Sequence, residues 1–359
     1  MPKKSGEASN RQVRIAYLFP GQGSQSVGMG LDLYQNSPAA KKVFDEADDV
    51  LGFSLSKLCF EGPAEELDKT ENTQPAIFTT SIACLRALQE KECDGHYAPD
   101  IVAGHSLGEL TSLVAADVLP FHDALRLVRR RGQLMQEASE THPGSMMAVL
   151  GMKEQEVLKI VHENGVKIAN VNSPEQIVVS GPKRYMDEVA AKIQARGGKI
   201  RLLKVSGAFH SPLMRPAQES LKEYISSLHF KNPKKPILSN LSARPLHRAI
   251  SLKYELVNHL CHCVRWCQSM EYLAKSGFLT AIEIGPGQVL SGILRRIEPN
   301  IQIINVNNSL SLQNIPNLLA APALPAKSAR TFFITRPSMS RQLAKAGRRR
   351  KQMGWAPTV

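Results

Sequence analysis

The residues of this chain best suited to covalent chemistry lie in the pentapeptide Gly-His-Ser-Leu-Gly at 104–108, between a short, mainly apolar run at 100–103 and a helical pattern at 109–116. Glycines on both sides of a serine let the backbone turn sharply from strand to helix and leave the hydroxyl exposed. We therefore predict that Ser106 is a nucleophile on such an elbow. The alternative is a structural turn, because the bare pattern occurs by chance in about one chain in ten of this length.

A serine hydroxyl needs an adjacent base, usually a histidine, and donors that receive the oxyanion. The chain has ten histidines. His105 adjoins Ser106, and because successive side chains at a tight turn point apart, we expect it to be a packing or supporting group. His210 lies in a loop at 205–212 that follows a predicted strand, so it can reach the elbow. His210 is the preferred base, with a solvated loop histidine as the alternative.

The elements around the elbow alternate between strand and helix. A β-rich run at 13–19 ends in a loop at 20–25, whose two glycines let backbone amides approach a ligand. Helical periodicity follows at 39–51, 76–91 and 121–138. This alternation favours a mainly parallel α/β sheet that binds ligands at the carboxyl ends of its strands.

The rhythm changes at about 145–205 to strand, helix, strand, strand, helix, strand, which is the ferredoxin-like order. The larger pattern then resumes, with a helix predicted through 259–274. We expect an α/β-hydrolase-like large domain with an inserted ferredoxin-like subdomain, and a cleft over the elbow where the two meet. We predict a discontinuous catalytic domain at 11–140 and 206–308, with the insert at 141–205. A basic, disordered tail is predicted at 309–359.

Composition excludes several classes of protein. The 359 residues are 43% hydrophobic, enough for a substantial core, and the sequence predicts neither a secretory signal nor a membrane span. The net charge of +13 is concentrated in residues 309–359, which hold nine Lys and Arg and no Asp or Glu, so the remainder carries only +4. We expect no nucleic-acid binding. A basic tail that binds nucleic acid or acts as a targeting signal is the alternative.

The six cysteines are unevenly placed and predict no disulfide framework, which fits a reducing, cytoplasmic location. Cys261, Cys263 and Cys267 cluster with His259 and His262. A zinc site is one interpretation. Because no second Cys-x-x-Cys pair lies elsewhere, we expect a buried or half-buried helix here and no metal.

Through several separated motifs the chain resembles one family, the malonyl-CoA:acyl carrier protein transacylases. This family includes discrete bacterial-type enzymes, and the acyltransferases of polyketide synthases are related to it. The resemblance covers about residues 11–308. It rests on Phe-Pro-Gly-Gln-Gly-Ser-Gln at 19–25, Thr-Gln-Pro-Ala at 73–76, Gly-His-Ser-Leu-Gly-Glu at 104–109, Arg-Gly at 131–132, Ala-Asn-Val-Asn at 169–172, Ala-Phe-His at 208–210 and Gly-Pro-Gly-Gln-Val-Leu at 285–290.

The resemblance implies a role for each matched residue. Ser106 becomes malonylated, and His210 activates it and later protonates the leaving thiolate. The backbone N–H groups of Gln22 and Leu107 form the oxyanion hole. Arg131 binds the free malonyl carboxylate. Its neighbours in the Arg-Arg-Arg run point elsewhere on a helix, so we expect them to be solvated or structural.

Further roles follow from the same resemblance. Gln74, Asn172 and Gln288 are expected to line the pocket, with turn or cap roles as the alternative. A main-chain oxygen near Gln288 is expected to orient the histidine, in place of an acidic residue. Phe209 resembles the malonyl-type signature, because its ring would crowd an α-methyl group.

The sequence thus predicts an acyl-carrier-protein S-malonyltransferase that uses a ping-pong route. We expect it to be a monomer that takes malonyl-CoA and holo acyl carrier protein, without metal or redox cofactor. The main alternative is a serine esterase or thioesterase of the α/β-hydrolase type. That enzyme would need an acid between Ser106 and the histidine, and although Asp123 and Asp187 satisfy the chain order, neither lies in a suitable element.

Overall fold

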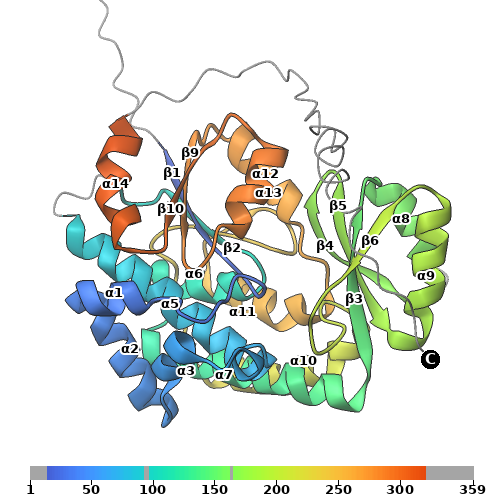
Figure 1. The fold of residues 1–359 in the computed structure, drawn as a ribbon, viewed down its shortest axis with the longest axis horizontal. Coiled ribbons are helices and arrows are strands. Elements are labelled where there is room, and N and C mark those ends of the chain that lie inside the picture. Colours follow the sequence, from blue (N-terminus) through green and yellow to red (C-terminus); the bar gives the residue numbers. More distant parts are fainter. Residues whose placement is uncertain (1–13, 93–96, 162–164, 321–359) are drawn as a thin grey trace, which may run out of the picture. The chain divides into compact units, whose positions relative to one another are not determined.

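A computed structural model describes residues 14–92, 97–161 and 165–320 of the chain. Within these ranges the strands form two separate sheets, a larger mainly parallel one and a smaller antiparallel one (Figure 1). The α/β fold predicted from the sequence is therefore confirmed. The predicted strand at 13–19 begins at the edge of the described region and is present from Ile15.

The large sheet has six strands in the described residues, in the spatial order β10, β9, β1, β2, β7, β8. All neighbours pair in parallel except β7 and β8, which are antiparallel. The strands are β1 (Ile15–Phe19), β2 (Ile101–Gly104), β7 (Ile237–Leu238), β8 (Pro245–Leu246), β9 (Thr280–Ile284) and β10 (Gln302–Val306).

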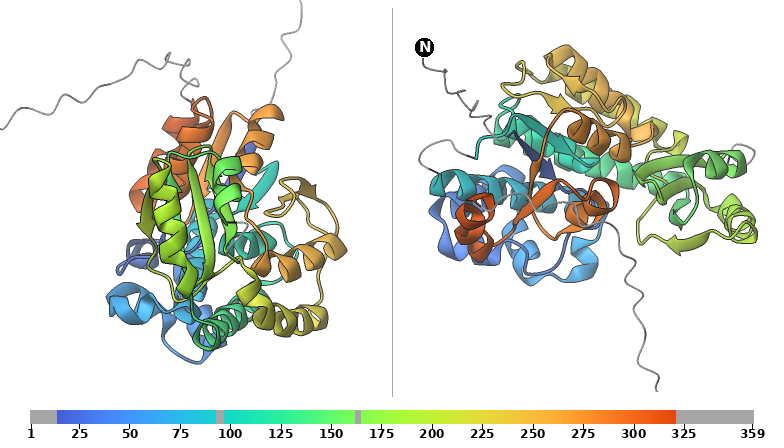
Figure 2. Two further views of the ribbon diagram at one scale, coloured as in Figure 1. Left: turned by 90° about the vertical axis from the view of Figure 1, so that its right-hand side faces the viewer. Right: turned by 90° about the horizontal axis from the view of Figure 1, so that it is seen from above.

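Both faces of the central strand β1 are buried, as expected for a parallel sheet covered by helices on two sides. Its alternate side chains belong to two different apolar clusters: Tyr17 and Phe19 pack in the cluster that includes α6, and Leu18 packs in the cluster that includes α12 and α13. Figure 2 shows the helices on the two sides of this sheet. The central strands are thereby held rigidly from both sides.

None of the helices outside the small domain is, within the described ranges, long and apolar enough to cross a membrane. They are α1 (Leu31–Asn36), α2 (Pro38–Leu51), α3 (Leu55–Glu61), α4 (Ala64–Leu67), α5 (Thr70–Lys91), α6 (Leu107–Ala115), α7 (Phe121–Thr141), α10 (Arg215–Ser227), α11 (Ala249–Asn258), α12 (Trp266–Lys275), α13 (Val289–Ile297) and α14 (Ser309–Ala320), with short 3₁₀ turns η1 (Pro212–Met214) and η2 (His259–Cys261).

The small sheet carries its own core. Its antiparallel strands stand in the order β4, β5, β3, β6, which is the ferredoxin-like arrangement, and α8 and α9 cover the face turned away from the large sheet (Figure 1). The elements are β3 (Gly144–Leu150), α8 (Glu154–Val161), β4 (Lys167–Ser173), β5 (Gln176–Pro182), α9 (Lys183–Ala195) and β6 (Lys199–Leu202).

The continuous helix predicted through 259–274 is wrong. The chain leaves α11, makes the short turn η2 and then becomes extended before α12 begins. In this break Val264 forms a bridge with Asn170 at β4, and backbone hydrogen bonds link it to Ala169 and Val171. Pairing with the small sheet overrides the local helical periodicity, and it also ties the two domains together.

The tail predicted from residue 309 starts too early. Residues 309–320 form α14, and Leu312 and Ile315 are buried in the main core. The boundary at 309 was placed by the abrupt change in charge, although the first residues after it carry an apolar face. The remainder of the predicted tail, at 321–359, lies outside the described residues.

The elbow between β2 and α6 packs tightly enough to require glycine. Gly108 lies against β1, and a Cβ added there would come 2.1 Å from the Phe19 carbonyl oxygen. At Gly104 an added Cβ would come 1.9 Å from the carbonyl carbon of Gly108. In both cases the obstacle is backbone, which cannot move aside without displacing a central strand or helix.

Substitution Gly108→Ala should therefore destabilise the protein by about 3 kcal/mol, in the range for overpacking a dense interior. Urea denaturation would measure this. The matched control is Gly292→Ala in α13, where an added Cβ meets nothing within 4 Å and where alanine should stabilise the helix by up to about 1 kcal/mol. Equal midpoints for Gly108→Ala and wild type would contradict the packing described here.

Candidate active site

Ser106 occupies the turn between β2 and α6 in a strained backbone conformation, with φ 51° and ψ −102°. Positive φ is unusual for a residue with a side chain and is typical of a nucleophile elbow. The Oγ atom lies 2.8 Å from Nε2 of His210, which itself has φ 56°. The structure thus brings together the predicted nucleophile and the predicted base.

The His210 ring is held from its other side by a main-chain oxygen. Nδ1 lies 2.8 Å from the carbonyl oxygen of His259, which can only accept, so the ring proton is on Nδ1. Nε2 is then free to accept the Ser106 hydroxyl proton. A main-chain oxygen was expected here, but its placement near Gln288 is wrong, because Gln288 is exposed just before α13. The break in the predicted helix at 259–274 is what brings the His259 carbonyl to this position.

His210 is kept neutral by its surroundings. It is 4% exposed, and burial, followed by the positive charge of Arg131, lowers its pKa to about 3. Both effects disfavour the imidazolium form. At neutral pH the ring is therefore in the form that can accept a proton from Ser106.

Arg131, on α7, places a buried cation beside the nucleophile. It is 1% exposed. Its Nη1 donates to Gln74 Oε1 at 2.6 Å, and its Nη2 lies 3.3 Å from Ser106 Oγ and 3.2 Å from His259 Nε2. Burial lowers the pKa of Arg131 to about 10, so the guanidinium stays charged at neutral pH. The site therefore offers fixed donors to an anionic group bound close to Ser106.

The two preceding arginines do point elsewhere. Arg129 donates to the Glu71 carbonyl and to Asn72 Oδ1. Arg130 is paired with Glu137 at 3.5 Å, and both of these side chains are exposed. Of the three consecutive arginines at 129–131, only Arg131 reaches Ser106. This agrees with the helix geometry, which turns successive side chains in different directions.

The loop after β1 lies directly against the elbow and carries Gln22. In the sheet register Phe19 is opposite Gly104, so the two strands end side by side. At Gly21 the backbone approaches so closely that an added Cβ would come 2.4 Å from the His105 carbonyl oxygen. Gln22 follows at once. Leu107, the other residue predicted for the oxyanion hole, is the first residue of α6, where backbone N–H groups point out of the helix end.

The remaining predicted residues divide into two groups. Gln74 is buried against Arg131, and Asn172 of β4 accepts a hydrogen bond at 2.9 Å from Nε2 of His105, so both belong to the site's surroundings. Phe209 is 5% exposed and packs in the main core next to His210. Gln288 is not brought to the catalytic pair by any contact described here.

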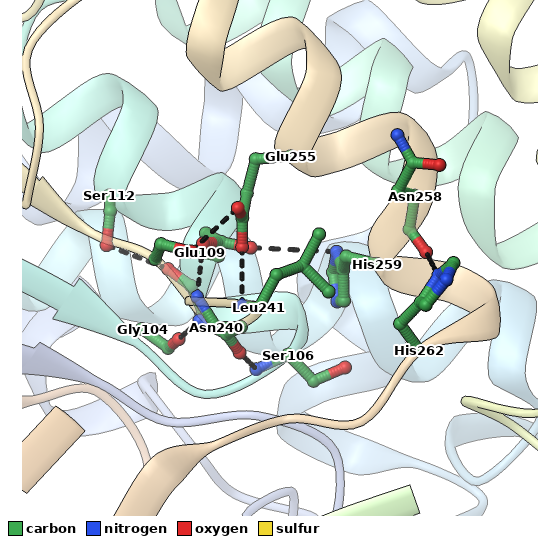
Figure 3. A network of polar contacts seen from close by, with 12 residues as sticks. Gly104, Ser106, Glu109, Ser112, Asn240, Leu241, Glu255, Asn258, His259 and His262 are labelled. Atoms are coloured by element: carbon green, nitrogen blue, oxygen red, sulfur yellow. Dashed lines mark hydrogen bonds and ion pairs between the residues drawn. The ribbon is translucent and has the colours of Figure 1, made fainter. Parts of the chain in front are cut away.

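Asn240, which follows β7, is a further residue of the site that no sequence motif indicated. Its Oδ1 accepts the Ser106 N–H at 2.8 Å, and its Nδ2 donates to the Gly104 carbonyl at 2.7 Å (Figure 3). One carboxamide thus bridges the two sides of the strained turn and holds its shape. The available signal was a short apolar run, Pro-Ile-Leu at 236–238, that is followed closely by this polar residue.

A buried acidic pair below the elbow was also missed. Glu109 of α6 accepts the Asn240 N–H at 3.1 Å and lies beside Glu255 of α11 (Figure 3). Burial and the neighbouring Glu255 carboxyl raise the pKa of Glu109 well above its usual value. Both effects favour the protonated, uncharged form of Glu109. A charged residue inside the otherwise buried helix at 107–114 was the signal for it.

The cysteine and histidine cluster does not form a common site. His259 faces Arg131 and His210, whereas Cys263 precedes α12 and Cys267 lies on it. Burial raises the pKa of Cys267 to about 12, so its thiol stays protonated. Among the residues the structure describes, no group of three His, Cys, Asp or Glu side chains could hold a metal ion.

The chain is similar to known acyl-transferring proteins. The family model described as acyl transferase domain matches residues 16–310. The malonyl CoA-acyl carrier protein transacylase of Bacillus subtilis is 45% identical over 307 residues, covering 84% of this chain and 95% of that protein. A polyketide biosynthesis transacylase of the same name from the same organism is 40% identical, covering 80% and 98%.

The chain is also similar to solved structures of malonyl transacylases. The malonyl CoA-acyl carrier protein transacylase of Coxiella burnetii matches with a TM-score of 0.83 at 33% identity, over 86% of this chain and 99% of that one. A malonyl-transacylase solved with its type II polyketide synthase acyl carrier protein matches with a TM-score of 0.80 at 38% identity, over 84% and 98%.

Ser106 should react at a rate that is nearly independent of pH between 7 and 5. The His210 pKa of about 3 keeps the base neutral throughout this range, whereas an ordinary histidine would lose about 20-fold in its neutral fraction. The measurement is the rate of labelling by a fluorophosphonate, with Ser106→Ala as the blank. A fall of that size, with the circular dichroism unchanged, would contradict the proposed state of the base.

Proposed function

The chain belongs to the acyl transferase family, and on that premise we propose that it transfers a malonyl group from malonyl-CoA to the phosphopantetheine thiol of a holo acyl carrier protein. The transfer proceeds through a malonyl ester on Ser106 and supplies extender units for fatty acid or polyketide synthesis. The main support for this proposal is the buried Arg131 guanidinium, whose Nη2 lies 3.3 Å from Ser106 Oγ. A cation there favours an acyl group that ends in a carboxylate.

In the first half-reaction Ser106 attacks the thioester carbonyl of malonyl-CoA. As the new C–O bond forms, His210 Nε2 takes the hydroxyl proton across the 2.8 Å contact. The tetrahedral intermediate then collapses, its C–S bond breaks, and His210 returns the proton to the departing CoA thiolate. The products are malonyl-Ser106 and CoA.

The second half-reaction reverses these roles. His210 accepts the proton of the phosphopantetheine thiol, the sulfur attacks the malonyl ester, and the C–O bond to Ser106 breaks. The same proton then restores the serine hydroxyl. Because Ser106 carries the malonyl group between the two halves and CoA leaves before the second thiol reacts, the transfer follows a ping-pong route.

Two groups of donors support these steps. The N–H groups of Gln22 and Leu107 are proposed to receive the developing oxyanion, one from the loop after β1 and one from the first turn of α6. Arg131 holds the distal carboxylate of the malonyl group. The position of this cation near Ser106 thereby determines which acyl chains are oriented for attack.

The esterase alternative is less well supported. A hydrolase triad orients its histidine with a carboxylate, whereas His210 is oriented by the His259 main-chain oxygen at 2.8 Å. Asp123 contacts His122 and Arg126 in the first turn of α7, and Asp187 is exposed on α9. A neutral ester would also gain nothing from the buried charge of Arg131.

The nucleophile, the base and the backbone donors together carry an acyl transfer, so we propose that the protein works without metal or redox cofactor. Malonyl-CoA and the holo acyl carrier protein are its proposed partners. We also propose that it acts in the cytoplasm as a monomer. A basic rim would favour encounter with the CoA phosphates and an acidic carrier protein, and salt would weaken this encounter.

Arg131→Ala should reduce malonyl transfer from CoA to holo acyl carrier protein by roughly 30-fold or more, since removing one partner of a buried charged pair costs about 2–5 kcal/mol. Loading of acetyl groups should change little. The matched control is Arg130→Ala, one position earlier on α7, where the side chain is 41% exposed. Wild-type protein that hydrolyses malonyl-CoA without transferring it, or a variant that loses both acyl groups equally while folded, would contradict the proposal.

Phe209→Ser should raise the use of methylmalonyl-CoA relative to malonyl-CoA by about 10-fold, because one methyl group typically accounts for about 1–3 kcal/mol of discrimination. Phe209→Leu, which keeps an apolar side chain in the core, should give an intermediate ratio. Competition between the two thioesters measures it. An unchanged malonyl preference in folded Phe209→Ser would remove this role for Phe209.

A further inference from the structure

The His259 side chain has no part in the steps above, yet it lies between two charged groups of the site. Its Nε2 is 3.2 Å from Arg131 Nη2. Its Nδ1 is 3.6 Å from Glu109 Oε2, and Figure 3 shows this second contact. The side chains of His259 and Glu109 are fully buried. We call this arrangement the Glu109–His259–Arg131 relay.

The protonation of the His259 ring follows from its neighbours. A guanidinium can only donate, so Nε2 must accept from Arg131. Burial and the Arg131 charge lower the pKa of His259 well below its usual value, so the ring is neutral. Its single proton is therefore on Nδ1, which faces Glu109. At 3.6 Å this contact is electrostatic rather than a full hydrogen bond.

The acidic end of the relay balances the charge of Arg131. The charge of Arg131 favours the ionised form of Glu109, whereas burial and the neighbouring Glu255 carboxyl raise the pKa of Glu109. Buried charges are tolerated when they are paired in this way. Neither Glu109 Oε2 nor His259 Nδ1 has a hydrogen-bond partner elsewhere in the described part of the chain. The acceptor oxygen and the N–H group therefore interact with each other.

We propose that the His259 side chain is a positioning residue that fixes the Arg131 guanidinium for recognition of a free carboxylate, and that it thereby determines acyl selectivity. This inference rests on the proposed function. The main-chain oxygen of His259 orients the base, whereas its side chain orients the cation. The two roles are separable, because a substitution changes the side chain and leaves the carbonyl in place.

The hold on Arg131 is otherwise limited. Gln74 fixes Nη1, and Nε has no hydrogen-bond partner within the described residues. Nη2 is held by His259 and Ser106, and the contact to Ser106 must change when that oxygen becomes acylated. His259 is therefore the protein group that keeps this end of the guanidinium oriented while the acyl-enzyme exists. A neutral acyl group does not depend on that orientation.

Two substitutions separate hydrogen bonding from ring packing. The rings of His259 and His210 stack with centroids 5.2 Å apart. His259→Phe keeps a ring against His210 and removes both nitrogens, whereas His259→Gln keeps an amide oxygen that can accept from Arg131. The matched control is His247→Phe, at an exposed position. Values of kcat and KM for malonyl-CoA and acetyl-CoA would be measured for each folded variant.

For His259→Phe we expect kcat/KM for malonyl-CoA to fall roughly 10-fold or more, as for loss of a hydrogen bond to a charged group. The acetyl value should stay within about threefold, and His259→Gln should recover most of the malonyl activity. An equal fall for both thioesters, or no fall, would overturn the inference. Wild-type protein that does not accept malonyl-CoA would instead overturn the proposed function.

A second measurement needs no stable variant at this position. Nitrogen-15 NMR of the histidine side chains in the wild-type protein reports which ring nitrogen carries the proton. We expect the His259 ring to be protonated on Nδ1 and unprotonated on Nε2. A proton on Nε2 would preclude acceptance from Arg131 and would overturn the relay.

Discussion

The strained backbone of Ser106 is the constraint on which the rest of the site depends. With φ at 51°, the residue projects its hydroxyl from a turn that no helix or strand would form. The conformation is held by packing of Gly104 and Gly108 against neighbouring backbone and by the Asn240 carboxamide, which bonds to both sides of the turn. The sandwiched central sheet makes this possible, because it fixes the strand that carries the elbow.

The electrostatics of the site depend on one buried cation, the Arg131 guanidinium beside Ser106. Burial, followed by the charge of Arg131, keeps His210 and His259 neutral, and the Glu109 carboxyl faces this cation across the His259 ring. A base with a lowered pKa and no carboxylate partner is a weak acceptor of protons. This suits an enzyme whose acyl-serine must persist until a thiol arrives, because water is then poorly activated.

Much of the molecule could be predicted from the sequence, and the exceptions share a physical cause. Alternation of strand and helix predicted the large sheet, and the compact pattern at 145–205 predicted the small one with its elements in the correct order. Ser106 and His210, whose side chains the structure brings into contact, could be singled out because side-chain type and local spacing mark them. The His259 main-chain oxygen could not be found that way, since a carbonyl has no residue signature. Asn240 and Glu109 likewise act through contacts between distant segments, and the pairing of Val264 with β4 overrode a helical pattern.

Acceptance of the malonyl group by the Ser106 hydroxyl, activated by His210, can be observed on the protein itself. Intact-protein mass spectrometry, followed by peptide mapping, would be carried out after brief mixing with malonyl-CoA in the absence of carrier protein. We expect the addition of a single malonyl group on Ser106, its absence in Ser106→Ala and its much slower appearance in His210→Ala. An adduct that persists in Ser106→Ala, or no adduct on the wild-type protein, would contradict this expectation.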